Sequence, residues 1–345
     1  MTYAVSLLHI FPDSGTFFLV ENYIDKIPEN YEVNKMASVL ITGASGMIGM
    51  YLTSSLLQKK HKVFAVDSKP NEFIGTNPDY SFIQCDITDK NAIEGVIKGN
   101  KIDTLVHLAC SVDNDIDSLI TDDVIKSSKT CDKFLYDAAV SANVTNILLL
   151  STTDVYGMQK GREPIREDTP EKGSSYYADM KLTSEKFLMK AVKKSNVTPV
   201  IARVAPVYTA EYTQNLRDRV YDAKEDVAYI IREGENSFSF CCVFNLIDFI
   251  NAIVSVPTVR YEGVFNIADT RMISAKEILD YERDHHRIGA VIQKQPPVNL
   301  VPLSKQRART DYRYFDISMA LANWYVDNVK AQRISTFRWN LKNTK

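Results

Sequence analysis

The sequence lacks several features that mark specialised classes of protein. No apolar run reaches the roughly 18 residues that a membrane helix needs. The net charge is only −2, which gives no electrostatic reason to expect a nucleic-acid partner. We therefore expect neither membrane nor nucleic acid among the partners. The 45% hydrophobic and 24% charged content is that of an ordinary globular protein.

Cysteines are few and poorly spaced for cross-linking. The five are Cys85, Cys110, Cys131, Cys241 and Cys242. The number is odd, two are adjacent, and no Cys-x-x-Cys motif is present, which argues against a disulfide framework and against a zinc site. We expect buried thiols in a reducing, cytoplasmic compartment and no bound metal.

The first 37 residues carry no chemistry that we can identify. The start MTYAVSLLHIFP is apolar but has neither a basic beginning nor a small-residue cleavage site, so a secretory signal is not expected. We predict an N-terminal extension over 1–37.

From Ser38 to about Tyr208, short apolar runs alternate with segments of helical spacing. This rhythm is typical of parallel strands joined by helical crossovers, and near-continuous apolar strands indicate a sheet covered on both faces. The sequence therefore predicts an α/β fold with a doubly wound parallel sheet. The expected strands are SVLITG, HKVFAVDS, YSFIQCD, IDTLVHLAC, VTNILLLST and VTPVIARV, and the expected helices are 45–60, 91–99, 133–143 and 174–194.

The stretch VLITGASGMIGMYL places three glycines at a strand-to-helix turn. Gly43 would permit the sharp turn, Gly46 would let the backbone approach a pyrophosphate, and Gly49 would let helix and strand pack closely. The helix N-terminus would then face the anion. This arrangement predicts a Rossmann-type dinucleotide-binding domain over 38–207, with a smaller, mainly substrate-binding region over 208–345 that is partly interleaved with the sheet.

Two aspartates refine the choice of dinucleotide. Asp67 ends the second strand, 18 residues after Gly49, where a carboxylate accepts hydrogen bonds from ribose hydroxyls and repels a 2′-phosphate. This favours NAD over NADP, although Lys69 would weaken the preference. Asp86, after the third strand, fits either of two roles: contact with the adenine amine, or the N-cap of the next helix.

A Tyr-x-x-x-Lys pair on a helix can move the proton that accompanies hydride transfer. Residues four apart share a helix face, and the ammonium favours the tyrosinate form. The pattern occurs at Tyr31/Lys35, Tyr156/Lys160 and Tyr177/Lys181, but only Tyr177 and Lys181 lie on a long predicted helix after the fifth strand. The partner hydroxyl should come from the end of that strand, where Ser151, Thr152 and Thr153 stand.

Together these residues resemble the extended short-chain dehydrogenase/reductase family, of the NAD-dependent epimerase/dehydratase type. The resemblance runs from about Ser38 to Asp269 through TGASGMIG, DITD, HLA, STTDVYG, YADMK and GVFNIA, in the family's order and spacing. It implies that the catalytic residues are Thr152, Tyr177 and Lys181. It implies that the cofactor is held by Gly43, Ser45, Gly46, Met47, Ile48, Gly49, Asp67, Asp86, Ile87, Leu108 and Ala109, together with Tyr177 and Lys181. It also implies a homodimer and a nucleotide-linked sugar as substrate.

The sequence departs from the family in the substrate half. Pro206 stands where an asparagine often meets substrate. In GENSFSFCCVFNLID, an aromatic such as Phe238 or Phe240 replaces an arginine that the family often has there for the pyrophosphate of the substrate. The helix before the fifth strand has SKTCD where Asn-x-x-Gly is common. These changes weaken the expectation of a standard nucleotide-sugar substrate and leave the cofactor half intact.

The residues after Thr152 bear on the reaction. Family dehydratases often have Thr-Asp-Glu there, whereas this chain has Thr152, Thr153 and Asp154. With one shorter acid, we favour hydride transfer with a single proton relay, as in a 4-epimerase or a keto-sugar reductase. A dehydratase or decarboxylase that uses Asp154 is the alternative. A non-catalytic NAD-binding sensor or scaffold is the alternative of another class.

Overall fold

The computed structural model describes residues 36–71, 77–110, 122–157, 159, 163–173, 175–222, 227–230, 233–256, 261–289, 292–294 and 324–344. Almost all of the predicted 1–37 extension, including Tyr31 and Lys35, lies outside these residues, and so does Lys160. Within the part described, no helix is both long and apolar enough to cross a membrane.

A seven-stranded parallel sheet forms the centre of the molecule, in the order β12-β6-β5-β4-β1-β2-β3. All six strands expected from the sequence are present, so the predicted doubly wound α/β fold is confirmed. The seventh strand comes from the 208–345 part of the chain. The strands are β1 (Ser38–Thr42), β2 (Lys62–Asp67), β3 (Tyr80–Gln84), β4 (Thr104–His107), β5 (Asn146–Thr152), β6 (Thr198–Val204) and β12 (Gly263–Ile267).

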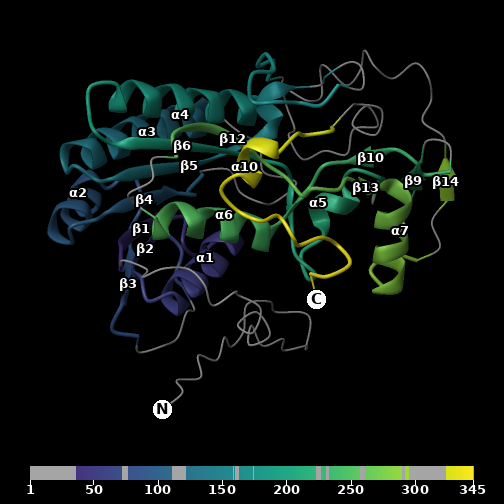
Figure 1. Cartoon of the computed structure of the whole chain (residues 1–345), viewed down its shortest axis with the longest axis horizontal. Coiled ribbons are helices and arrows are strands. Elements are labelled where there is room, and N and C mark those ends of the chain that lie inside the picture. The colour runs from purple at the N-terminus through teal and green to yellow at the C-terminus, as the bar shows by residue number, and fades with distance from the viewer. Residues whose placement is uncertain are drawn as a thin grey trace.

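Helices cover both faces of this sheet (Figure 1). In the view of Figure 1, α2 (Lys90–Gly99), α3 (Asp122–Ser141) and α4 (Tyr176–Val192) lie on one side of the sheet, toward the upper left, and α1 (Met47–Gln58) and α6 (Val243–Ser255) lie on the other side. Alternate residues of each strand enter the two cores. Val39 and Ile41 pack with α1 and α6, whereas Leu40 packs on the other side.

Helix α3 begins earlier than the sequence indicated. Its first half, DDVIKSSKTCD, carries many charged and hydroxyl side chains and little apolar periodicity, so the helical signal there is weak. The helix nevertheless extends along α4, where tertiary packing supports it.

A third apolar cluster organises most of the remaining elements, at the right of Figure 1, whereas η2 and α10 pack into the first core. Phe238, Phe240 and Trp324 are buried in it, and a capping box of Ser274 and Glu277 starts α7. The elements are η2 (Thr153–Tyr156), β7 (Val207–Tyr208), α5 (Gln214–Arg217), β8 (Tyr221–Asp222), β9 (Val227–Tyr229), β10 (Ser237–Phe238), β11 (Cys241–Cys242), β13 (Ile273–Ser274), α7 (Ala275–Asp284), β14 (Ile292–Lys294) and α10 (Val329–Gln332).

The expectation about cysteines is met in part. All five are free, as the spacing predicted. Cys131, Cys241 and Cys242 are buried, but Cys85 and Cys110 are only partly buried, so a buried position is wrong for these two.

Candidate active site and cofactor site

The glycine turn joins β1 to α1 and packs against the end of β4. Gly43 has a φ of 75°, and a Cβ there would lie 2.7 Å from the Ala109 nitrogen. A Cβ on Gly49 would lie 2.4 Å from the Gly43 oxygen. The structural roles expected of these two glycines, the sharp turn and the close packing, are therefore confirmed. The same contacts bring Leu108 and Ala109 to the turn.

Gly46 differs from its two neighbours in the motif. The nearest atom to a Cβ there is the Gly43 oxygen at 3.4 Å, an ordinary contact, so the protein itself does not require glycine at this position. Helix α1 begins at Met47, and among the described residues no side chain caps it and no acid lies in its first turn. The N–H groups of this turn and the helix dipole are thus available to an anion such as a pyrophosphate.

Asp67 stands beside this turn at the end of β2. Its Oδ2 accepts a hydrogen bond from the Ser45 N–H at 2.9 Å, and its Oδ1 accepts one from the Lys69 N–H at 2.9 Å. Two backbone donors thus fix the carboxylate at the turn, and the unused lone pairs suit ribose hydroxyl groups.

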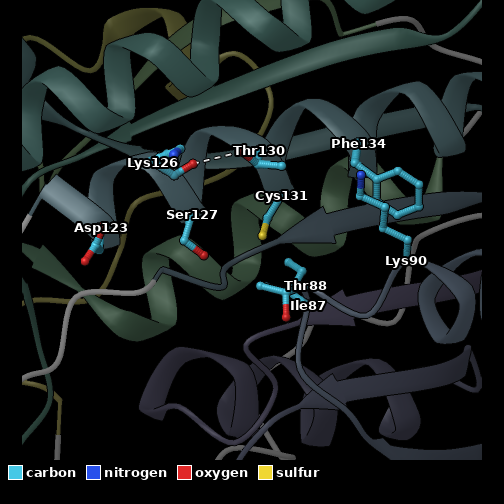
Figure 2. Close-up of a pocket in the computed structure, with 9 residues that line it drawn as sticks. All are labelled: Ile87, Thr88, Lys90, Asp123, Lys126, Ser127, Thr130, Cys131 and Phe134. Carbon is cyan, nitrogen blue, oxygen red and sulfur yellow. Dashed lines mark hydrogen bonds between the residues drawn. The ribbon is translucent and has the colours of Figure 1, made fainter.

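A pocket of about 280 Å³ opens directly after Asp86, between the start of α2 and the first half of α3 (Figure 2). Asp86 does not cap α2, because Asp89 accepts the hydrogen bond from the Ala92 N–H instead. Of its two predicted roles, the helix cap is therefore wrong. Figure 2 shows Cys131 of α3 directed toward Ile87 and Thr88. The lining residues are Ile87, Thr88, Lys90, Asp123, Lys126, Ser127, Thr130, Cys131 and Phe134.

The predicted catalytic lysine reaches from α4 to the end of β5. Ser175 caps α4 by accepting a hydrogen bond from the Ala178 N–H, and Lys181 lies on the helix face toward the sheet, 6% exposed. Its Nζ donates to the Leu150 oxygen at 2.9 Å and lies 5.8 Å from the centre of the Tyr177 ring. The ammonium is therefore placed to favour the phenolate of Tyr177.

Thr152 ends the same strand, two residues after Leu150. It is buried, and its Oγ1 accepts a hydrogen bond from the Asp154 N–H at 3.2 Å. Because α4 packs against β5 and η2, the structure brings Thr152, Tyr177 and Lys181 to one edge of the sheet. This edge is the carboxyl end of the strands, where open α/β sheets bind ligands.

Tyr156 has a structural role. Its hydroxyl donates to Asn266 Oδ1 at 2.7 Å, and the Arg203 guanidinium lies 4.9 Å from the centre of its ring. Burial raises the pKa of this phenol to about 12, so it is a poor proton carrier. This agrees with the choice of Tyr177 over Tyr156 from the sequence.

Asp154 has a buried oxygen that faces no partner. Its Oδ1 forms no hydrogen bond with any described residue, whereas its backbone N–H donates to Thr152 Oγ1. Buried acceptors are normally paired, so this atom is available to a ligand.

Sequence reasoning missed a buried ionic cluster under the site. Ser151 Oγ donates to Glu185 Oε1 at 2.5 Å, and Arg203 Nη2 donates to Glu185 Oε2 at 2.6 Å. Arg203 also pairs with Glu171. Two signals pointed to this cluster: a charge inside the apolar strand VIARV, and an acid four residues after Lys181 on the same helix.

The substitutions noted in the substrate half lie mostly inside the protein. Phe238 and Phe240 are 1% and 0% exposed and pack edge-on, with their ring centres 6.2 Å apart. Their rings belong to the third core, and neither occupies an open surface position that a pyrophosphate arginine would take. Pro206 is partly buried, and its oxygen accepts a hydrogen bond from the Cys241 N–H.

Comparison with known proteins identifies the class. Residues 39–268 match the model of the NAD dependent epimerase/dehydratase family. Because this match covers most of the chain, the protein belongs to that family, as the sequence motifs indicated, and NAD is its cofactor. It is therefore an NAD-dependent enzyme, and the open helix terminus at Gly46 fits this cofactor.

Individual relatives are distant. The chain is 24% identical over 302 residues to the uncharacterised protein y4nG of Sinorhizobium fredii, covering 82% of this chain and 72% of the relative. It is 27% identical over 179 residues to human dTDP-D-glucose 4,6-dehydratase, covering 49% and 51%. It is 28% identical over 166 residues to UDP-glucose 4-epimerase of Lactobacillus helveticus, covering 46% and 48%. The chain thus aligns with about half the length of these two enzymes.

Solved structures support the fold over nearly the whole length. MoeE5 in complex with UDP-glucuronic acid and NAD matches with a TM-score of 0.66 and 21% identity, covering 89% of this chain and 96% of that one. The Bordetella bronchiseptica enzyme WbmG in complex with NAD and UDP matches with a TM-score of 0.67 and 21% identity, covering 90% and 92%.

Proposed function

We propose that this protein transfers a hydride between NAD and a carbon atom of a nucleotide-linked sugar, as a 4-epimerase or a keto-sugar reductase. The observation that carries the proposal is the position of Lys181, whose ammonium is bound to Leu150 O at the end of β5 and lies beside the Tyr177 ring. The names of the relatives agree with it, since they include a UDP-glucose 4-epimerase and structures with UDP sugars bound.

Each residue has a distinct part in this reaction. Tyr177, as phenolate, takes the proton of the sugar hydroxyl, and it returns that proton when the ketone is reduced. Thr152 donates a hydrogen bond to the same sugar oxygen, and Lys181 stabilises the phenolate. NAD supplies the hydride acceptor, and its reduced form supplies the donor.

The cofactor side is assigned on the same basis. The glycine turn with Ser45, Met47 and Ile48 would hold the pyrophosphate, and Asp67 the adenosine ribose. The pocket behind Ile87 would take the adenine, with Asp86 at its edge. Leu108 and Ala109 would line the approach from β4 to the nicotinamide half.

We also infer a homodimer in the cytoplasm. Helices α3 and α4 pack side by side on one face of the sheet, and Met189 of α4 is 44% exposed. Five free cysteines are typical of a reducing compartment. Light scattering on the purified protein checks the dimer.

Elimination through Asp154 is the second candidate function. It is favoured by the buried Oδ1 of Asp154, which has no hydrogen-bond partner among the described residues, in a residue whose N–H is bonded to Thr152. A carboxylate at the site can take the proton from the sugar carbon next to the ketone and pass it to the neighbouring hydroxyl group, which leaves as water; this elimination is the step that a dehydratase adds to hydride transfer.

One experiment separates these candidates. The protein is incubated with a panel of nucleotide sugars and NAD or NADH, and products are analysed by mass and stereochemistry. We expect unchanged mass with inverted stereochemistry, or a gain of two hydrogens. Loss of water or carbon dioxide would assign the elimination instead. Undiminished turnover by a Tyr177→Phe variant would contradict the relay, and NAD binding without turnover of any sugar in the panel by the wild type would favour a non-catalytic sensor or scaffold.

A further inference from the structure

Helix α4 is joined to the end of strand β5 at a second point, one turn beyond Lys181. Glu185 Oε1 accepts a hydrogen bond from Ser151 Oγ at 2.5 Å, and Ser151 directly follows Leu150, whose oxygen binds Lys181. Ser151 and Glu185 are 3% and 5% exposed, so water does not compete for this bond. Residues four apart share a helix face, so Tyr177 precedes these two anchor residues on the same face of α4.

The guanidinium of Arg203 on β6 fixes Glu185 in turn. Its Nε donates to Glu185 Oε1 at 3.1 Å and its Nη2 donates to Glu185 Oε2 at 2.6 Å, so both carboxylate oxygens are held. Arg203 is 2% exposed and lies opposite Ser151 in the pairing of β5 with β6. The Glu185 carboxylate therefore bridges two neighbouring strands one residue before Thr152, and it cannot turn without breaking three hydrogen bonds.

Arg203 also contacts η2. Its guanidinium lies 4.9 Å from the centre of the Tyr156 ring in this turn, which begins directly after Thr152. A second ion pair joins Arg203 to Glu171, an exposed residue. One buried cation thus contacts the turn that follows Thr152 and, through Glu185, holds helix α4.

We propose that Glu185, held by Arg203, is a positioning residue that fixes the placement of Tyr177 relative to Thr152. The inference rests on the proposed function, in which these two side chains act on one sugar oxygen. The bond from Lys181 to the backbone of β5 alone would allow α4 to rotate about that point, and the bond from Ser151 to Glu185 one turn away opposes this rotation. Such positioning matters because a displacement of about 1 Å at reacting groups costs about 10²-fold in rate.

Two carboxylates on the same guanidinium provide a matched pair of variants. Glu185→Gln and Glu171→Gln each take one negative charge from Arg203, but only Glu185 lies on α4. We expect Glu185→Gln to lower kcat by about ten- to hundred-fold with little change in KM, because the interaction that it weakens aligns the reacting groups. We expect Glu171→Gln to stay within about three-fold of the wild type in both constants. Rates are expressed per NAD-bound site, so that unfolded protein does not count.

An apolar replacement of the ion pair separates positioning from stability. Apolar side chains of similar volume often replace a buried ion pair without loss of stability, so we expect Glu185→Leu with Arg203→Met to melt near the wild-type temperature. We expect its kcat to remain at least about ten-fold low, because the bond from Ser151 is absent. Ser151→Ala removes only that hydroxyl and keeps both charges. It should lower kcat in the same direction, and it serves where the double variant does not fold.

The crystal structure of the folded variant with NAD provides a measurement that needs no substrate. We expect the Tyr177 hydroxyl to lie about 1 Å from its wild-type position relative to Thr152 Oγ1. An unmoved Tyr177 overturns the inference, and so does a wild-type kcat in the stable double variant or an equal loss of kcat in Glu171→Gln. A displaced Tyr177, in a protein whose wild type turns over no sugar of the panel, would defeat the proposed function alone.

Discussion

The ammonium of Lys181 donates a hydrogen bond to the carbonyl oxygen of Leu150, 2.9 Å away, and so joins helix α4 to the end of strand β5. Thr152 follows two residues later on the same strand. The separation between the predicted proton relay and its partner hydroxyl is thus set by one helix packed on one strand. Rigid elements hold such a geometry more accurately than loops do.

The glycine turn offers a matched pair of variants. We expect Gly46→Ala to have nearly the melting temperature of the wild type, because a Cβ at this position meets no protein atom closer than 3.4 Å. We expect it to bind NAD at least ten-fold more weakly, because the Cβ would occupy the space in which the pyrophosphate approaches the backbone. We expect Gly49→Ala to lower the melting temperature markedly, because its Cβ would meet the Gly43 oxygen at 2.4 Å. Calorimetry measures both quantities. Normal NAD binding by a folded Gly46→Ala would contradict the assignment of this turn.

Thr152 can be tested by removing its hydroxyl without changing its shape. We expect Thr152→Val to lower kcat by about 10²–10³, the usual effect of losing a hydrogen-bond donor to a reacting oxygen. Thr152→Ser keeps the hydroxyl and should stay within about ten-fold of the wild type. Steady-state kinetics on the substrate found in the sugar panel provides the measurement. Equal activity of the two variants would leave Thr152 only as the acceptor for the Asp154 N–H.

His61 makes stability depend on pH. Its Nδ1 accepts a hydrogen bond from the Ala37 N–H, and burial followed by the charge of Lys59 lowers the pKa of this histidine. The unfolded chain therefore takes up a proton first as the pH falls below about 6.5, and stability is lost there. We expect wild type to lose about 1 kcal/mol more between pH 7.5 and 5.5 than His61→Gln loses, by urea unfolding. His286→Asn, at an exposed histidine, should show the wild-type dependence.

Asp269 also makes stability depend on pH, but it raises stability as the pH falls. Burial raises its pKa to about 6, although hydrogen bonds from Tyr208, the Cys242 N–H and Asn245 partly offset that rise. The folded state thus binds this proton before the unfolded state does, and stability is gained as the pH falls through about 6. We expect Tyr208→Phe to lower the free energy of unfolding by about 1–3 kcal/mol at pH 7.5 and by less at pH 5. At pH 5 Asp269 is protonated, and a neutral carboxyl group loses less than a carboxylate when the Tyr208 hydroxyl is removed.

Urea unfolding at the two pH values measures this difference. In the background of Asp269→Asn, the cost of Tyr208→Phe should become independent of pH. A cost that stays pH-dependent without the carboxylate would show that another group is responsible.

Local signals were enough for the cofactor half of the molecule. The six apolar strands could be recognised because both faces of the sheet are covered. The spacing of Gly43, Gly46 and Gly49 predicted a tight turn, and the structure has one, with a positive φ at Gly43 and close contacts at Gly43 and Gly49. The position of Tyr177 and Lys181 on one long helix favoured Tyr177 over Tyr156 as the proton-transferring tyrosine. In the structure, Tyr156 is buried and donates a hydrogen bond to Asn266. These features depend on residues close together in the sequence, so they can be predicted from apolar periodicity and motif spacing.

Contacts between distant segments were not predictable in this way. The pairing of β12 with β6 and the meeting of His107 with Asp132 join residues whose proximity only the assembled fold determines. The weakly patterned first half of α3 was missed for a related reason, because packing on α4 supports it more than its own apolar spacing does. The same limit applied to Phe238 and Phe240, whose burial depends on the third core.

Strand β12 has a consequence for how the protein can be divided. It is the last strand of the central sheet along the chain, yet it covers the edge of β6. Asn266 of β12 in turn donates hydrogen bonds to Ile165 O and Asp327 O. A fragment cut after β6 would leave an unpaired, apolar strand ready to associate with other copies. During synthesis, the nucleotide-binding half must therefore wait for residues far downstream before its sheet is closed against aggregation.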